Sequence, residues 1–167
     1  KELQHLLAYD SDLFNRWDAS QKLCLKTILK LVGDYQQDKE LKLESSFVDA
    51  FGRLLSQKDL DKAFLAEIFN IPSESFIGDH MATIDVDAIH GVREFVLKTL
   101  AQAHATEFKS VYHELKGREK GVLSPAAMGE RALKNICLAY LMQLETAEVV
   151  DLCYLQFHEC LTMTDEI

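Results

Sequence analysis

The stretch from Arg131 to Leu144, RALKNICLAYLMQL, constrains this chain more than any other. Inside it, residues 136–142 (ICLAYLM) follow one another without a charged or strongly polar side chain. A helix of that composition is apolar on nearly every side, so neighbouring elements must cover it from several directions. The stretch is much shorter than the roughly 20 apolar residues that span a bilayer. It therefore predicts the central helix of a soluble helical domain.

Composition narrows the class of protein further. With 48% hydrophobic and 27% charged residues among 167, the chain is an ordinary globular one, long enough for a single domain or for one piece of a larger domain. Seven glycines and two prolines leave little turn chemistry for a β-rich chain, so helix is expected throughout. The formal net charge of −9 and the pI near 5.1 argue against a nucleic-acid partner, because phosphate binding needs clustered Lys and Arg.

The first half of the chain predicts helices that are separated by capping residues. Residues 10–12 should cap a long amphipathic helix that ends near Gly33. After a polar connection over residues 36–44, Ser45 or Ser46 should cap the next helix.

Two shorter helices are expected to follow. Asp59 should cap a helix over residues 60–69, which forms a hairpin with the helix before it. Pro72 stops that helix, since proline disfavours helical backbone in the residue before it. Ser73 should then cap a short helix carrying Phe76, Ile77 and Met81.

In the second half, residues 86–115 keep an almost unbroken helical period after a cap at Asp85. This predicts one helix of about 30 residues or two nearly collinear ones, well above the usual mean of about 11 to 12. Ser124 and Pro125 should open the central helix, because Ser is a favoured cap and Pro fits the first helical position. Thr146 should cap a further helix that closes near residues 158–160.

Both ends of the chain look cut. Residues 1–8 have leucines at helical spacing without a preceding cap, and residues 162–167 have the form of another helix start. We therefore expect residues 1–167 to form a single helical domain, the N-terminal part of a larger one. Its expected fold is all-α, a right-handed αα-superhelix built of antiparallel helical hairpins. In such a fragment the last hairpin, with Tyr154 and Phe157, should lack its next layer.

The four cysteines are expected to be buried free thiols in a reducing compartment, which predicts a cytoplasmic location. They lie within apolar helical runs, and no two of them show the C-x-x-C spacing of a zinc or redox pair. The residues concerned are Cys24, Cys137, Cys153 and Cys160.

No catalytic or metal constellation emerges from the residues. The His-Glu-x-x-His zinc motif has two near matches, at His113 and at His158, but Gly117 and Thr162 stand where the second His is required. His90 with Glu94, and His104 with Glu107, lie about one helical turn apart, as do many ordinary surface pairs. Core packing likewise accounts better for the group of Cys153, His158 and Cys160. We therefore predict no catalytic, cofactor-binding or metal-binding residue in this chain.

Arg16 and Trp17 form the one surface motif that invites a recognition role. Trp17 is the only tryptophan, and it lies on the apolar face of a predicted helix. A tryptophan in that position more often belongs to the core.

The order of segments along the whole chain resembles the C-terminal helical domain of the bacterial M1-family aminopeptidases N, which are zinc alanyl aminopeptidases. The stretches that carry the resemblance are residues 14–21 (FNRWDASQ), 84–94 (IDVDAIHGVRE), 131–138 (RALKNICL), 156–159 (QFHE) and 163–165 (MTD).

The resemblance implies a parent enzyme that removes N-terminal residues from peptides. In that family zinc and the catalytic Glu belong to a thermolysin-like domain upstream, and the helical domain closes over the site as the wall of a chamber. The implied partners are the catalytic domain of the same polypeptide and the peptide substrates of the parent enzyme, with no nucleic acid and no membrane. No catalytic residue of the family matches a position in this chain.

We interpret the chain as that helical domain without its catalytic domain. By itself it is then not expected to be an enzyme. It is also expected to have no cofactor of its own, since the zinc belongs to the parent enzyme. Two alternatives stay open at this stage. One is a free-standing helical-repeat module that binds a partner protein. The other is a small helical enzyme using His90, Glu94 and His104.

Overall fold

The computed structural model describes residues 3, 6–7, 10–118, 122–161 and 163. Within those residues the chain forms eight helices and no strand, which confirms the all-α prediction. They are α2 (Leu13–Tyr35), α3 (Ser45–Leu55), α4 (Lys62–Phe69), α5 (Glu74–Gly78), α6 (Val86–Ala103), α7 (Ala105–Leu115), α8 (Pro125–Met142) and α9 (Ala147–Glu159). None of these helices is both long enough and apolar enough to cross a bilayer. The helices expected at residues 1–8 and after residue 162 fall largely outside the described part.

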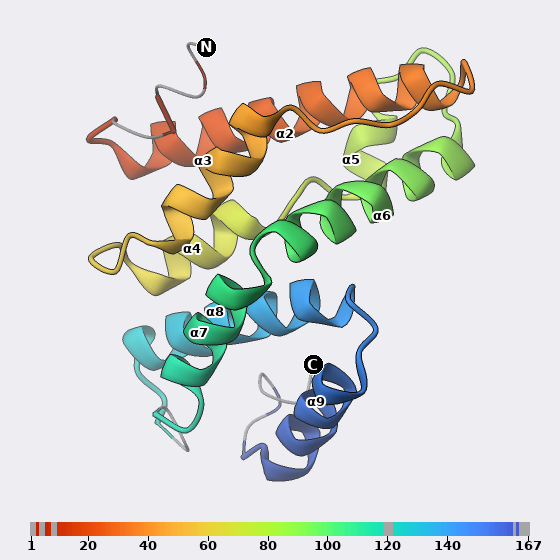
Figure 1. Ribbon diagram of the computed structural model, residues 1–167. Helices are drawn as coiled ribbons and strands as arrows, with labels where there is room; N and C mark the ends of the chain where they lie inside the picture. Colours follow the sequence, from red (N-terminus) through yellow and green to blue (C-terminus); the bar gives the residue numbers. More distant parts are fainter. Residues whose placement is uncertain (1–2, 4–5, 8–9, 119–121, 162, 164–167) are drawn as a thin grey trace.

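The helices stack in successive layers between α2 at one end of the molecule and α9 at the other (Figure 1). α2 packs against α4, α5 and α6, and α3 contacts α4, α6 and α7. α8 contacts α4, α6 and α7 in the middle of the stack, and α9 packs against α8. This layered arrangement of helices is the one expected of an αα-superhelix.

The central position predicted for residues 131–144 is confirmed. α8 buries side chains on several sides, and its neighbours α4, α6, α7 and α9 surround it. Ala139 is the exception within the apolar run, because it faces solvent. The apolar side chains of α8 that the fold buries are Ala127, Leu133, Cys137, Leu138, Tyr140 and Leu141.

A chain of aromatic rings runs through the core and links four helices. Phe47 contacts Phe51, which contacts Phe69, with ring centroids 5.0 and 5.6 Å apart. Phe69 meets Phe108 edge-on at 6.0 Å, and Phe108 stacks on Tyr140 at 4.6 Å. The Tyr140 hydroxyl donates to the Phe69 carbonyl at 2.9 Å, so this buried polar group is paired and costs little.

Most helix starts follow the predicted caps, and two do not. The side chains of Asp12, Ser73, Asp85, Ser124 and Thr146 accept backbone N–H groups of their helices. The cap predicted at Ser45 or Ser46 is wrong, because Glu44 precedes α3 and makes no side-chain cap bond.

The cap predicted at Asp59 is also wrong. Asp61 accepts the Phe64 N–H at 2.9 Å, so α4 starts at Lys62 and the chain turns over residues 58–60 instead. Two predicted ends shift as well: α2 continues to Tyr35, and α5 stops before Met81.

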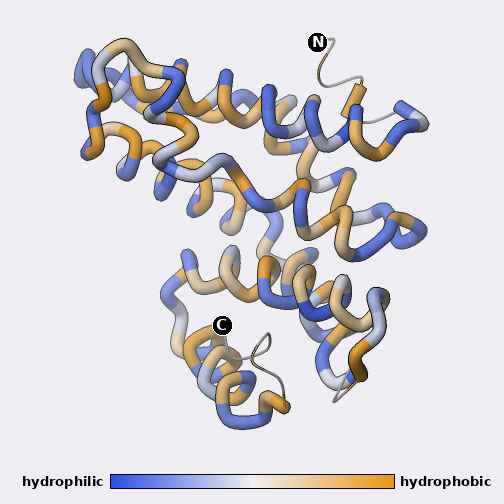
Figure 2. The backbone as a smooth tube through the Cα atoms, turned by 180° about the vertical axis from the view of Figure 1, so that it is seen from behind, coloured by the Kyte–Doolittle hydropathy of each residue, from blue (hydrophilic) through white to orange (hydrophobic). Residues whose placement is uncertain are grey.

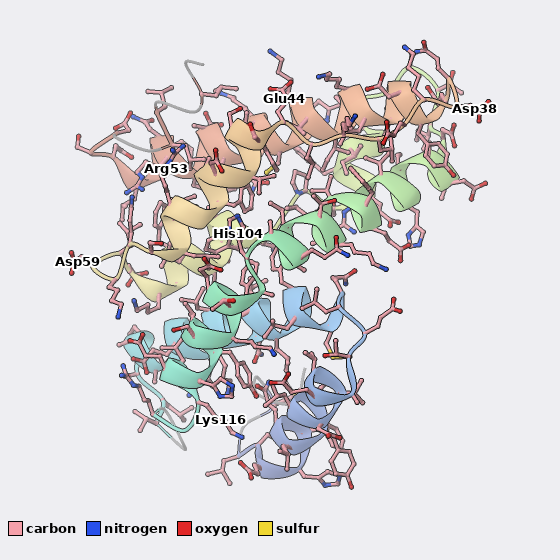
Figure 3. The ribbon with its side chains drawn as sticks, viewed as in Figure 1. Asp38, Glu44, Arg53, Asp59, His104 and Lys116 are labelled. Atoms are coloured by element: carbon pink, nitrogen blue, oxygen red, sulfur yellow. The ribbon has the colours of Figure 1, made fainter. Side chains whose placement is uncertain are left out.

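The long helical stretch of residues 86–115 is two helices that change direction at His104 (Figures 1 and 3). His104 leaves helical geometry with φ −125° and ψ 27°. Its Nε2 lies 2.9 Å from the Val48 carbonyl oxygen, to which it donates, so the side chain ties the junction to α3. Gly52 lies so close that a Cβ there would be 2.5 Å from the His104 ring.

Candidate functional site

An open cleft on the α2 end of the molecule is the strongest candidate site. It encloses about 610 Å³, within the roughly 300–1,000 Å³ that ligand pockets usually occupy. We call it the Trp17 cleft: α2 contributes Trp17, Gln21 and Leu25, and the residues between α4 and α5 contribute Ile71 and Pro72. Phe76 and His80 from the α5 region and Arg93 from α6 complete its walls.

The sequence positions these residues for simple reasons. Trp17, Gln21 and Leu25 follow one another at four-residue intervals, so they share one face of α2. The chain cannot continue α4 past Pro72, and the connection from α4 to α5 runs beside that face without covering it, with the Asn70 carbonyl within hydrogen-bond distance of Gln21. The cleft therefore forms where a helix face meets a proline-stopped connection.

Two hydrogen bonds fix that connection in place. The side-chain amide of Gln21 donates to the Asn70 carbonyl at 3.1 Å. Arg93 Nε donates to the Pro72 carbonyl at 2.9 Å. The connection is thus held from α2 on one side and from α6 on the other, which makes the cleft a preformed feature.

Two ion pairs involve charged side chains that line the cleft. Lys22 pairs with Asp18 at 2.7 Å, and Arg93 Nη1 lies 3.8 Å from a Glu74 carboxylate oxygen. The lining contains two cations, Lys22 and Arg93, and two carboxylates, Asp18 and Glu67. With largely apolar walls and equal numbers of cations and carboxylates, this site is suited to binding rather than to proton transfer.

Arg16 and Trp17, which the sequence suggested as a surface motif, differ in how deeply they are buried. Arg16 is buried: its Nε donates to the Leu7 carbonyl at 2.8 Å and its Nη2 to Gln57 Oε1 at 3.0 Å. Burial is the main cause that lowers the pKa of Arg16 from its ordinary value. Trp17, which we assigned to the core, is only half-buried and lines the cleft.

The histidine pairs do not assemble into a metal site. His90 Nδ1 lies 2.9 Å from Glu74 Oε1, and His90 Nε2 lies 3.5 Å from Glu94 Oε1, all on an exposed surface. The hydrogen bond to Glu74, followed by the charge of Glu94, raises the pKa of His90. His104 is engaged with α3 as described above. No group of three metal-ligating side chains occurs within the described residues.

The cysteines are free in all four positions, as predicted, but only two are buried. Burial raises the pKa of both the Cys24 and the Cys137 thiols to about 12, which leaves them protonated and unreactive. Cys153 and Cys160 are half-buried, so the prediction of four buried thiols is wrong for them. The Cys160 thiol donates to the Phe157 carbonyl at 2.9 Å.

The remaining residues that the sequence singled out serve as packing partners. His158 lies against Tyr154 with ring centroids 4.2 Å apart, and His113 meets Tyr112 edge-on at 5.5 Å. Each of these two histidines contacts an aromatic side chain of its own helix.

Exposed apolar side chains form a second apolar surface on α9. This helix lies at the opposite end of the molecule from α2 (Figures 1 and 2). Tyr154 is 63% exposed and Phe157 52% exposed, so no element among the described residues covers them. Val150 continues the row, so that the three side chains follow at intervals of four and three residues, and Leu161 is a further exposed apolar side chain just beyond the end of α9. Apolar side chains at that spacing form the seam along which one helix packs against another.

Sequence reasoning found the seam on α9 but missed the Trp17 cleft. The spacing of Trp17, Gln21 and Leu25 was visible, yet a helix face does not reveal whether the next element covers it. Phe76, His80 and Arg93 gave no signal, because they reach the cleft only through the crossing of α5 and α6.

The chain matches one protein family along its entire length. The family is described as "Domain of unknown function (DUF3458_C) ARM repeats", and the match covers residues 1–167.

Curated relatives resemble the chain over all or nearly all of its length. It is 36% identical to aminopeptidase N of Escherichia coli (strain K12) over 168 residues, 100% of this chain and 19% of the relative. It is 29% identical to aminopeptidase N of Caulobacter vibrioides over 97% of this chain and 18% of the relative. The chain therefore spans about a fifth of the length of these curated relatives.

A solved structure shares the fold. The crystal structure of Legionella pneumophila aminopeptidase A in complex with aspartic acid superimposes with a TM-score of 0.82 at 24% identity, covering 99% of this chain and 20% of that one. At that identity the likeness establishes the fold alone.

Proposed function

The chain belongs to the DUF3458_C family of ARM-repeat domains, and from that premise we propose that it is the non-catalytic helical domain of a zinc aminopeptidase N. The parent enzyme would belong to the M1 family and would remove N-terminal residues from peptides in the cytoplasm. The helical domain would pack against the catalytic domain of the same polypeptide, cover the active-site chamber and restrict entry to small unfolded peptides.

One observation carries this proposal. The whole chain aligns with aminopeptidases N, yet it corresponds to only about a fifth of each relative. A segment that takes up so small a part of an enzyme, and that offers a preformed apolar cleft instead of acid, base and nucleophile, is suited to an architectural role.

The zinc of the proposed parent enzyme would be held elsewhere in the polypeptide. A catalytic zinc needs three protein ligands and an open position, and the nearest approach here is the exposed group of His90, Glu74 and Glu94, which holds one imidazole between two carboxylates. The described residues of this chain do not fit a catalytic zinc site, so no step of the reaction is assigned to them.

The test is the activity of the complete protein encoded by the gene. We expect it to contain about one zinc per chain and to hydrolyse aminoacyl arylamides, with both properties lost together on chelation. A complete protein that folds, binds no zinc and cleaves no arylamide would refute the enzyme assignment. The alternative of a free-standing interaction module would then be the better interpretation of the two apolar surfaces.

A further inference from the structure

Both cations that line the Trp17 cleft already have partners. Lys22 pairs with Asp18 at 2.7 Å. Arg93 Nε donates to the Pro72 carbonyl at 2.9 Å, and its Nη1 lies 3.8 Å from Glu74, which does not line the cleft. An anionic ligand would therefore have to compete with the groups that these two side chains already contact.

Glu67 is the charged side chain of the lining that lacks a partner. It lies on α4, and within the part of the chain that the structure describes its carboxylate has no hydrogen bond and no ion pair. Since the other charges of the lining are engaged, the cleft presents this one negative charge to whatever enters it. The net charge of −9 on the whole chain adds a field of the same sign, which attracts cations.

Aromatic rings form much of the apolar wall of the cleft. Phe76 is 45% exposed and Trp17 is half-buried, so both rings keep surface available to a ligand. His80 Nδ1 donates to the Phe76 carbonyl at 2.8 Å, and its ring lies 4.7 Å from the Phe76 ring between centroids, which braces that wall. Trp and Phe rings attract cations and also pack against apolar groups. The rings and the Glu67 carboxylate therefore favour the same class of ligand.

From this arrangement we propose that the Trp17 cleft binds a small organic cation, an amine or quaternary ammonium whose positive group pairs with Glu67 and whose apolar body packs on Trp17 and Phe76. A neutral ligand would cover the carboxylate without pairing it, which is costly, and an anion would add a second negative charge beside it. The volume of about 610 Å³ suits a small molecule. This binding requires no catalytic group, so it is independent of the enzyme assignment.

The experiment uses the complete protein encoded by the gene and three photoreactive probes that share one phenyl ring bearing a diazirine. They are the benzylamine, which is a cation at neutral pH, the uncharged benzyl alcohol and the benzoate anion. After illumination, mass spectrometry locates each label residue by residue, and the label on residues 17–25 of α2 reports occupation of the cleft. Unlabelled 2-phenylethylamine in excess is the competitor.

Two variants test the two parts of the site. Glu67→Gln removes the charge and keeps the size of the side chain, and Phe76→Leu removes a ring and keeps an apolar side chain. Glu107→Gln is the matched control, because Glu107 is an exposed glutamate on α7 that does not line the cleft.

The amine should label residues 17–25 about tenfold more strongly than the alcohol at the same subsaturating concentration, because an exposed charge pair and a cation–π contact each contribute roughly threefold. The benzoate should label them least, and excess 2-phenylethylamine should remove the amine label. Glu67→Gln and Phe76→Leu should each lower amine labelling about threefold. Glu67→Gln should leave labelling by the alcohol unchanged, and Glu107→Gln should change nothing.

Four results would overturn the proposal. Equal labelling by the amine and the alcohol would show an apolar site that does not select charge. Strongest labelling by the benzoate would show an anion site at Lys22 and Arg93. An amine label that Glu67→Gln leaves unchanged would show that this carboxylate takes no part in binding. A cleft that none of the probes labels is covered by another part of the protein, whether or not that protein is an active aminopeptidase.

Discussion

Gly129 offers the sharpest test of how closely α8 packs against its neighbours. It lies buried in the first half of α8, where that helix crosses α4. A Cβ built at Gly129 would lie 2.8 Å from the backbone nitrogen of Ala63, 3.1 Å from its Cβ and 3.3 Å from its Cα. The nearest atom belongs to the backbone of α4, so a methyl group can be accommodated only if one helix moves.

Two opposing effects determine how Gly129→Ala changes the free energy of unfolding. Alanine is favoured over glycine inside a helix by about 1 kcal/mol. Forcing extra volume into a packed contact costs typically about 1–3 kcal/mol. We therefore expect Gly129→Ala to lower the free energy of unfolding by about 1 kcal/mol, because the close backbone contact outweighs the gain in helix propensity.

Gly33 is the matched control within the same chain. It also lies in a helix, α2, but a Cβ at Gly33 would meet no atom within 4 Å. Gly33→Ala should therefore raise the free energy of unfolding by about 0.5–1 kcal/mol.

Urea denaturation followed by far-ultraviolet circular dichroism measures both substitutions, and thermal melting should separate them by about 4–8 °C. If Gly129→Ala proves as stable as Gly33→Ala, α4 and α8 are not in the close contact that the structure shows.

Four further predictions address other parts of the molecule. Leu138→Asp should abolish the cooperative melt, because it places an unpaired carboxylate in the central helix; an unchanged melt would show that α8 is not central. The pair of His90 with Glu74 stabilises the fold below the unfolded pKa of His90, and this contribution is lost as the pH rises through the raised folded pKa. Accordingly, urea midpoints of wild type and His90→Gln should differ more at pH 6 than at pH 8, and an equal difference would refute the pairing. Metal analysis of the 167-residue chain should find no stoichiometric zinc, and one tightly held zinc would contradict the assignment of the metal to another domain. Replacing Tyr154 and Phe157 with serine should reduce self-association in sedimentation experiments, with little change in melting temperature. If the solution mass of both the wild-type chain and the variant is independent of concentration, the α9 face is not an uncovered apolar surface. A longer chain that melts no higher than the 167-residue chain would argue the same way.

Features that depend on a few consecutive residues were accessible from the sequence. The caps at Asp12, Ser73 and Ser124 involve a side chain and a backbone N–H only two or three positions away, so their geometry follows from the local sequence. The same locality explains why α8 could be identified as central, since a helix with apolar residues on every side has to be covered whatever the topology.

The break at His104 depends on contacts distant in sequence. The ring of His104 binds a carbonyl group 56 residues earlier in the chain, and this partner is defined only once α3 and α6 are packed together. The spacing of apolar residues over positions 86–115 does not reveal that the helix breaks at His104.

Arg16 and Trp17 show most clearly what only the tertiary structure decides. Both residues stand side by side on α2, and the sequence alone suggests that the cation faces solvent and the indole faces the core. Arg16 is buried instead because the Leu7 carbonyl and the Gln57 side chain, 9 and 41 residues away, supply acceptors for its guanidinium. Trp17 is left half-exposed because the connection at Pro72 crosses α2 without covering it. A helix period determines which residues share a face, but the path of the rest of the chain determines which face is buried.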